Sequence, residues 1–522
     1  MIQAHLSCFR RILFICMLSI FTVAYIWAAE HDKLDEIVRI SKNKGTVYEL
    51  LKDISIQSGF FFIYDSQIID NDKKVKITKG NYSLRDAIYL IAGNNNLQID
   101  LSGEYILLRV ADKKARTNIE EISSKKEETH FSIGGRLFDS ATGEPVAFAS
   151  AGLLHTSIGT ITNLDGEFKL VIPDTLQNLK VRLSHIGYKS QEIDVPLLKE
   201  GFVSIEMNPQ IVSLHEVVVN AVNPVSTINE MLKNRESNYS AEPVHLTTFY
   251  REGIDHNNLN TDLTESILHV HKTGYNKNAL NDQVKLIKKR RVTNRVRTDT
   301  IFPKMRSGIN SCLILDIIKE LPVFLTPDET IQYKYSYVGK NSLDNRIVNI
   351  ISFQQKENIM EPLYSGELFI EEGNKALVEV RFEINPRFTN QATNMFVDKK
   401  SSGLRINLQY ARYIVSYKPS DDGLYYVNHV RGDLQFKIRH KKRLSGSPLN
   451  FWFEMVTCKV DTENNNPFRQ KERISTTRIF AETKHDYDKN FWENFNIILP
   501  EEKLKENIIQ NLNDIIITVT EE

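Results

Sequence analysis

The chain has 522 residues, and a prior of about 100 to 200 residues per domain predicts three or four domains. Hydrophobic residues make up 41% and charged residues 25%, which indicates neither a polytopic membrane protein nor a globally disordered chain. Because Lys plus Arg equals Asp plus Glu at 66 each, no net charge draws the chain onto nucleic acid, and we expect none to bind.

Residues 1–29 differ from the rest of the chain. A basic pair precedes an apolar run from Ile12 to Trp27, and the small residues Ala28 and Ala29 follow it. This order is typical of a secretory signal peptide, and the run is shorter than the roughly 20 residues that a bilayer span needs. We therefore expect export, with cleavage after Ala28 or Ala29. An uncleaved N-terminal anchor is the alternative, and in both cases the body lies outside the inner membrane of a Gram-negative-type cell.

Cysteine use is low. Cys8 and Cys16 lie in the leader, so only Cys312 and Cys458 remain in the mature chain. They could pair in an oxidising compartment, but they form no disulfide framework and have no metal-ligand spacing.

Two capped helices are predicted between residues 33 and 110. Thr46 and Glu49 form a capping box ahead of apolar residues at helical spacing, and Gly59 ends this helix. Ser83 and Asp86 repeat the pattern in a second helix, which ends at Gly93. Short apolar runs that predict strands surround the helices at 37–40, 60–64, 75–77, 97–101 and 105–110. The predicted order is a doubled βαβ unit.

These residues resemble a known family over nearly the whole of 33–110. The pattern Thr46-Val47-x-x-Leu50-Leu51, Gly59-Phe60 and Ser83-Leu84-x-x-Ala87-Ile88 is similar to that of the secretin and TonB short N-terminal domain. The resemblance implies a periplasmic protein-interaction module found at the front of outer-membrane transporters and secretins. In some transporters that module signals to an inner-membrane regulator. A small α/β fold of another family is the alternative interpretation.

Residues 111–130 are polar and mixed in charge, which predicts a solvated linker. From 131 to 208 the apolar period changes to two, and Asn163-Leu164-Asp165-Gly166 supplies a tight turn. The predicted strands lie at 131–138, 147–153, 159–162, 167–172, 180–185, 191–195 and 203–207. Seven short strands predict a β-sandwich.

Several spaced motifs in this stretch resemble the carboxypeptidase regulatory-like β-sandwich. They are Gly135-Arg136-Leu137, Gly143-Glu144-Pro145-Val146, Thr162-Asn163-Leu164-Asp165-Gly166-Glu167-Phe168 and Ser184-His185-Ile186-Gly187-Tyr188. The resemblance implies an accessory domain without an active site, so no peptidase activity follows from it. Zinc-ligand spacing is also missing. The nearest candidate, His269-Val270-His271, has no evident third ligand, so an ordinary strand is the better interpretation. We expect no metal and no cofactor.

A candidate partner-binding segment follows the sandwich. Its residues resemble the stretch near the TonB box of glycan-uptake TonB-dependent transporters, and they are Leu214, Glu216, Val217, Val218 and Val219. A buried or edge strand leading out of the sandwich is the alternative. About 300 residues remain after this segment, far fewer than a 22-stranded transporter barrel needs.

Residues 209–522 are predicted to form one β-rich domain. Helices are expected at 227–234 and 309–320, and extended segments at 332–338, 346–353, 365–371, 376–384, 408–417, 424–437 and 451–459. This pattern predicts a long antiparallel sheet. Residues 320–480 are faintly similar to the half-barrels of periplasmic lipoprotein carriers, which implies a concave apolar face for an acyl chain or a partner strand. The basic runs at 288–297 and 439–443 are expected in exposed turns or strand ends.

The sequence therefore predicts a multidomain, mainly β protein with a small βαβ-repeat domain. Its expected function is that of a non-catalytic adapter at the periplasm or the periplasmic face of the outer membrane. The expected partners are envelope proteins, such as an inner-membrane regulator or an outer-membrane transporter component, with lipid or glycan contact left open. One alternative is an envelope hydrolase in which carboxylates such as Glu252, Glu265, Glu367 and Glu371 pair at roughly 5 to 10 Å. A remnant TonB-dependent signal transducer is the other.

Overall fold

The computed structural model describes residues 33–64, 69, 73–94, 97–102, 105–110, 129–199, 201–210, 222–256, 259–293, 304–305, 308–326, 329–399, 403–442, 445–463, 465–483, 494–502 and 504. The predicted leader, the candidate segment Leu214–Val219 and all but the last two residues of the predicted linker lie outside these ranges. The chain divides into two compact units, Met1–Lys126 and Glu127–Glu522.

The first unit contains the two predicted helices, α2 (Val47–Ser58) and α3 (Leu84–Ala92). The Thr46 hydroxyl accepts from the Glu49 N–H at 3.2 Å, and the Glu49 carboxylate accepts from the Thr46 N–H at 3.0 Å. Gly59 and Gly93 then end the two helices with φ values of 73° and 63°, a left-handed conformation that costs glycine little. Both helix predictions are confirmed.

Three small sheets surround these helices. Their strands are β1 (Ile37–Ile40), β2 (Lys44–Thr46), β3 (Phe61–Tyr64), β4 (Lys74–Lys76), β5 (Gly80–Ser83), β6 (Leu97–Ser102) and β7 (Tyr105–Val110). Strand β1 pairs with β5, β2 with β4, and the third sheet has the order β3-β7-β6 with β3 parallel to β7. The two short strands β2 and β5, which end in the helix caps Thr46 and Ser83, were not predicted.

The second unit opens with the predicted sandwich. Its strands are β8 (His130–Asp139), β9 (Ser150–Leu153), β10 (Gly159–Ile161), β11 (Glu167–Pro173), β12 (Lys180–Ser184), β13 (Gln191–Asp194) and β14 (Phe202–Met207). They form two sheets with the orders β10-β9-β12-β13 and β11-β8-β14, so the seven-stranded prediction is confirmed. The Asn163 side-chain oxygen accepts from the N–H groups of Asp165 and Glu167, which closes the tight turn.

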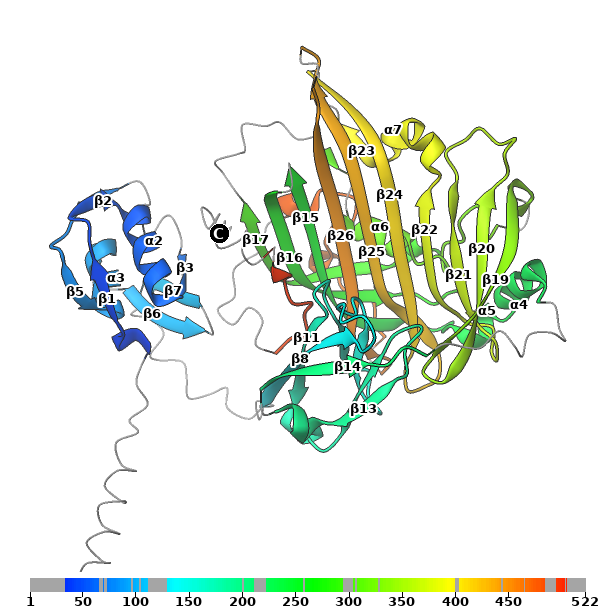
Figure 1. The fold of residues 1–522 in the computed structure, drawn as a ribbon, viewed down its shortest axis with the longest axis horizontal. Helices are drawn as coiled ribbons and strands as arrows, with labels where there is room; N and C mark the ends of the chain where they lie inside the picture. The colour runs from blue at the N-terminus through cyan, green and yellow to red at the C-terminus, as the bar shows by residue number, and fades with distance from the viewer. Residues whose placement is uncertain are drawn as a thin grey trace, which may run out of the picture. The chain divides into compact units, whose positions relative to one another are not determined.

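A ten-stranded antiparallel sheet forms the rest of this unit (Figure 1). In spatial order its strands are β17 (Gln283–Thr293), β16 (Leu259–Lys272), β15 (Val244–His256), β26 (Ser447–Asp461), β25 (Tyr425–His440), β24 (Leu404–Pro419), β22 (Leu377–Ile384), β21 (Tyr364–Glu371), β20 (Arg346–Gln355) and β19 (Tyr333–Leu343). The seven strands from 333 to 461 match the predicted extended segments. Strands β15 and β17 were not predicted, because charged residues interrupt their apolar alternation, and of β16 only a strand at His269-Val270-His271 was expected. The sheet therefore extends well beyond the 320–480 region expected from sequence.

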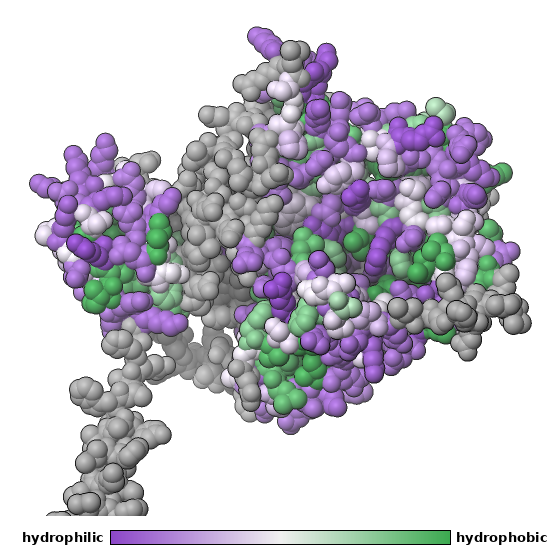
Figure 2. Space-filling model, in the orientation of Figure 1, coloured by the Kyte–Doolittle hydropathy of each residue, from purple (hydrophilic) through white to green (hydrophobic). Residues whose placement is uncertain are grey.

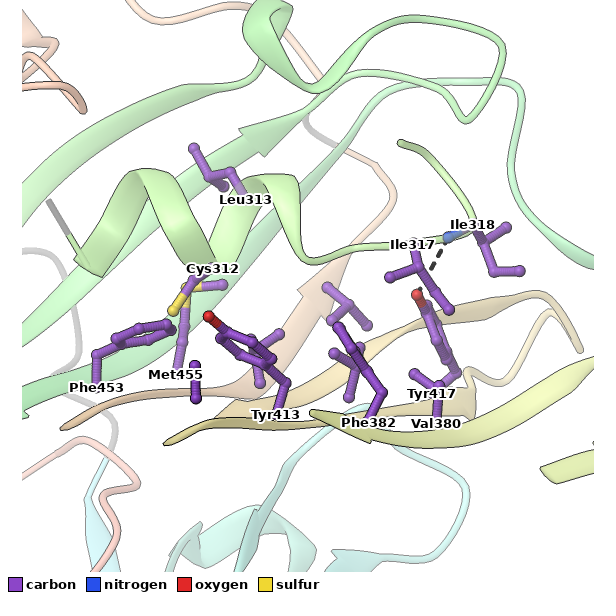
Figure 3. Close-up of a cluster of buried hydrophobic side chains, with 14 of the residues drawn as sticks. Cys312, Leu313, Ile317, Ile318, Val380, Phe382, Tyr413, Tyr417, Phe453 and Met455 are labelled. Carbon is purple, nitrogen blue, oxygen red and sulfur yellow. Dashed lines mark hydrogen bonds between the residues drawn. The ribbon is translucent and has the colours of Figure 1, made fainter. Parts of the chain in front are cut away.

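One face of this sheet is filled by the chain itself. Helix α6 (Gly308–Ile314) and the residues that follow it pack against the strands, and Cys312 points from the helix toward the side chains of the sheet (Figure 3). Phe324 packs in the same cluster and stacks on Phe353 at a ring-centroid distance of 4.2 Å. Residues from 308–326 thus pack on an apolar face, where the resemblance to lipoprotein carriers implied room for an acyl chain or a partner strand.

Helix α6 is shorter than the predicted 309–320 because Asp316 turns into the core. Its carboxylate lies 2.5 Å from Lys272 Nζ and accepts from the Tyr417 hydroxyl at 2.9 Å. Lys319 is likewise buried, and its ammonium lies 2.5 Å from Asp282. Two lysines and two aspartates thus balance one another in the core, which fixes the segment after α6 in a non-helical path.

The remaining helices lie at the edges of the sheet. They are α4 (Pro224–Lys233), α5 (Arg235–Asn238) and α7 (Thr393–Phe396), and a two-stranded ribbon joins β18 (Lys304–Met305) to β23 (Val397–Lys399). Asn223 caps α4 by accepting from the Ser226 N–H, and this helix was predicted. Within the described ranges, no helix combines the length and apolar character that a membrane crossing requires.

Candidate functional site

The residues singled out from sequence do not assemble into a metal centre. His269 and His271 lie on β16, and His271 Nδ1 is 3.2 Å from Nε2 of His245 on the neighbouring strand. His245 Nε2 also lies 2.8 Å from the carbonyl oxygen of Asn466. Across the part of the chain that the structure describes, no group of three or more potential metal ligands occurs. The candidate segment Leu214–Val219 lies outside the described residues.

The four carboxylates considered for hydrolysis do not converge either. Glu265 is ion-paired with Arg290 on β17, and Glu371 forms an ion pair of 2.6 Å with Arg346 on β20. Thr264 lies opposite Glu252 in the register, so Glu252 and Glu265 are on opposite faces of adjacent strands. Glu367 lies opposite Arg381 in the register.

A row of alternating charges crosses five neighbouring strands of the large sheet. Successive members lie directly opposite one another in the strand register, in the order Arg290 (β17), Glu265 (β16), Arg251 (β15), Glu454 (β26) and Arg431 (β25). The side chains of Arg251 and Glu454 are both 0% exposed, and Arg251 Nε donates to Glu454 Oε2 at 2.8 Å. Arg431 Nη1 lies 3.4 Å from the same carboxylate. We call these five residues the charge row.

The buried members of the charge row stay charged because each has oppositely charged neighbours. Burial alone would raise the pKa of Glu454, but Arg251 and Arg431, together with a hydrogen bond to His429, hold that pKa well below its usual range. Burial opposes the charge on Arg431, whereas Glu454 and Asp433 raise its pKa. An unpaired charge at any of these buried positions would cost several kcal/mol, so each member stabilises its neighbours in the charged form.

The C-terminal residues 494–502 lie against the charge row and are called here the C-terminal strap. Glu501 accepts from Arg251 Nη2 at 2.6 Å and from Nη1 at 3.2 Å, a bidentate ion pair. On the sandwich side, Asn496 Oδ1 accepts from the Val171 N–H at 2.6 Å, and the Thr160 hydroxyl donates to the Ile497 carbonyl at 3.0 Å. The strap therefore joins the sandwich to the large sheet.

Direct contacts also connect the sandwich with the sheet. Ser157 Oγ donates to the Val460 carbonyl at 2.7 Å, and Ser190 Oγ donates to Asp344 at 2.8 Å. Phe148 has a φ of 60°, which is strained for a bulky residue, and its ring stacks on His429 at a centroid distance of 5.1 Å. The structure thus holds a strained backbone position where the sandwich meets the charge row.

The basic residues at 288–291 were expected in exposed turns or strand ends, but Lys288 is buried and the other three are partly buried. These residues belong to β17, where Arg290 joins the charge row and Arg291 is ion-paired with Asp262. Lys289 Nζ donates to three backbone carbonyls, those of Phe480, Ala481 and Thr483. Basic residues of this run are therefore used to hold other parts of the fold. The described part of the second run, residues 439–442, lies at the end of β25 and in the turn after it.

Glu252 is buried on the other face of the sheet. It accepts a hydrogen bond of 2.6 Å from the Tyr250 hydroxyl, and burial raises its pKa to about 7. Gly308 at the start of α6 lies directly above it, since a Cβ there would fall 2.1 Å from the Tyr250 hydroxyl and 3.1 Å from Glu252 Oε2. The carboxyl group is thus enclosed by packing.

The two remaining cysteines are separate. Cys312 packs in the large apolar cluster under α6, whereas Cys458 packs with Ile161 and Ile498 at the sandwich side of the sheet. Both thiols are free and buried, and burial raises the pKa of Cys458 to about 12. The pairing that the sequence left open does not occur.

Comparisons with known proteins identify one part of the chain. Residues 133–219 match the model of the CarboxypepD_reg-like domain, which confirms the sandwich family predicted from sequence. No match supports the secretin and TonB short N-terminal domain at 33–110, so that resemblance stays a prediction. No curated protein matches the chain.

Two solved structures show a distant likeness. One is a putative outer membrane lipoprotein-sorting protein domain from Vibrio parahaemolyticus, with 8% identity and a TM-score of 0.22, covering 47% of this chain and 95% of that chain. The other is a DUF1329 family protein from Desulfovibrio piger, with 9% identity and a TM-score of 0.21, covering 48% of this chain and 99% of that chain.

Proposed function

We propose that this chain is an exported envelope protein that acts without catalysis, as an adapter between other envelope proteins. In this proposal the leader at 1–29 directs export, and the first unit binds a partner protein. The sandwich, the strap and the large sheet form one rigid body that carries the first unit and offers a second binding surface.

The observation that carries the proposal is the use of the charged groups. Of the carboxylates considered for catalysis, Glu265 and Glu371 form ion pairs within the fold, and Glu252 is enclosed beneath α6. Arg251 joins the C-terminal strap to the sheet through Glu501, and Glu454 is ion-paired with Arg251 and Arg431 within the sheet. Such an arrangement favours a rigid binding body over a catalytic cleft.

Exposed apolar side chains support a binding role for the first unit. Ile37, Ile56 and Leu90 are 66%, 73% and 44% exposed in a unit whose core is otherwise buried. On the sandwich, Leu197 and Phe202 are 63% and 58% exposed. Figure 2 shows hydrophobic residues gathered on the surface of this part of the molecule. If the first unit is a secretin and TonB short N-terminal domain, its partner is an inner-membrane regulator or an outer-membrane transporter component.

Affinity capture from envelope extracts tests the proposal. The mature chain from residue 30 is compared with a chain that begins at residue 127, so that the control lacks only the first unit and the linker. We expect envelope proteins to be recovered by the longer chain and to be absent with the shorter one. Equal recovery with both chains, or no recovery above background with either, contradicts the assignment of partner binding to the first unit.

A further inference from the structure

A small cavity lies between the sandwich and the large sheet, away from the charge row. Its volume is about 40 Å³, and its walls come from β9 and β10 of the sandwich and from β24, β25 and β26 of the sheet. Since about 10 to 15 Å³ of such space holds one water molecule, the cavity has room for about three waters or one small oxyanion. Its lining combines hydroxyl groups, Asn428 and one lysine, Lys418, with apolar side chains such as Val427 and Val460.

Lys418 reaches from the end of β24 into this cavity. Its ammonium donates to Ser150 Oγ at 3.3 Å, and within the described residues it has no carboxylate ion pair. The space that it occupies exists because residue 152 is glycine, since a Cβ there would lie 2.3 Å from Lys418 Nζ. Burial lowers the pKa of Lys418, and the attraction of Asp344 and Asp421, neither of which forms an ion pair with it among the described residues, offsets this effect only in part.

The hydroxyls around the cavity fall into two sets. Ser157, Thr160 and Thr457 donate their protons to backbone carbonyls and so fix the walls. The hydroxyl of Ser150 accepts from Lys418 and keeps its own proton, and the Ser420 hydroxyl also faces the cavity without using its proton elsewhere among the described residues. Together with the two remaining N–H groups of Lys418, the cavity thus presents donors around a positive charge.

We propose that this cavity is a binding site for a phosphate-type oxyanion, held by the Lys418 ammonium and the hydroxyls of Ser150 and Ser420. An oxyanion places a negative charge in direct contact with the ammonium and accepts hydrogen bonds from all three groups, whereas a water molecule brings no charge. The bound group bridges the sandwich and the large sheet. It is either free inorganic phosphate or the phosphate of a lipid headgroup, since both present the same oxygens.

The test uses the complete mature chain in a buffer free of phosphate and sulfate. Binding of inorganic phosphate is measured by calorimetry and by the shift in melting temperature, against sodium chloride at equal ionic strength. Binding to phosphatidylcholine vesicles with and without phosphatidic acid is measured in parallel. We expect phosphate to bind and to raise the melting temperature, or phosphatidic acid vesicles to bind selectively. The first result identifies a free oxyanion, and the second a lipid headgroup.

The variants Lys418→Met and Lys340→Met form the matched pair. Lys340 is also a partly buried lysine, but its ammonium already has a partner, Glu372, at 2.7 Å. We expect Lys418→Met to weaken oxyanion binding by about tenfold or more, in keeping with the loss of a charged hydrogen bond, and Lys340→Met to leave it unchanged. If Lys418→Met fails to fold, Gly152→Ala provides the second variant, because its methyl group displaces the ammonium.

Two results would overturn the proposal. One is the absence of any effect of phosphate or phosphatidic acid beyond that of chloride. The other is binding that persists equally in Lys418→Met, Gly152→Ala and Lys340→Met, which would place the anion elsewhere.

Discussion

Replacing Arg251 with Met is expected to lower the free energy of unfolding of the second unit by about 3 to 5 kcal/mol. The change removes the central cation of the charge row. Glu454, which is 0% exposed, then keeps only Arg431 and His429, and Glu501 of the C-terminal strap loses its bidentate partner. The expected loss of unfolding free energy is large because removing one cation leaves buried carboxylates without full charge compensation.

Tryptophan fluorescence during urea unfolding measures this effect. Of the three tryptophans, Trp27 is in the expected leader, whereas Trp452 and Trp492 belong to the second unit, so the signal reports on that unit alone. Arg182→Met is the control, since Arg182 and its partner Glu192 are 41% and 42% exposed and such pairs contribute less than about 1 kcal/mol. If Arg251→Met lowers the free energy of unfolding no more than Arg182→Met does, the charge row does not stabilise the second unit as we expect.

Replacing Glu252 with Gln is expected to make the protein less sensitive to pH. Burial raises the pKa of Glu252 in the folded chain to about 7, from an ordinary value of 4.5. The folded chain therefore binds more protons than the unfolded chain between these values, and stability falls as pH rises through this window. Gln keeps an oxygen to accept from Tyr250 but never ionises, so the variant becomes the more stable protein above pH 7, by at most about 3 kcal/mol.

The measurement is urea unfolding of both proteins at several pH values between 4.5 and 8. The difference in unfolding free energy is expected to grow in favour of Glu252→Gln as pH rises and then to become constant. Asp262, Lys289 and Arg291 also contribute to the charge around this carboxyl and remain unchanged in the variant. Glu192→Gln serves as the control because its carboxylate is exposed and paired. If the free energy of unfolding depends on pH in the same way in Glu252→Gln and in the natural chain, Glu252 is not the source of the pH dependence.

Local patterns in the sequence predicted much of the fold. The caps at Thr46 and Ser83 and the glycines that end both helices are signals within a few residues, so α2 and α3 were found with accurate limits. The seven sandwich strands followed from their period of two and from turn residues such as Asn163. Helix α6 was predicted too long because its apolar spacing continues past Asp316, and only the tertiary ion pair with Lys272 shows that this carboxylate turns inward.

The charge row could not be predicted because it depends on strand order. Arg251 and Glu454 are 203 positions apart in the sequence, and they meet only because β26 returns to pair with β15. Read locally, such residues are charges that interrupt apolar strands, and for this reason β15 and β17 were missed and the basic run at 288–291 was assigned to the surface. Charged residues inside otherwise apolar strands are the signal in the sequence that points to a buried ionic row.

Site-specific photo-crosslinking in living cells tests the adapter function most directly. A photoreactive amino acid replaces Ile56 of the first unit in one strain and Ile331 of the second unit in another; these side chains are 73% and 74% exposed, so neither change disturbs the core. The account predicts an adduct with an envelope protein from position 56 and none with that protein from position 331. Equal adducts from both positions, or adducts with cytoplasmic proteins only, would contradict it.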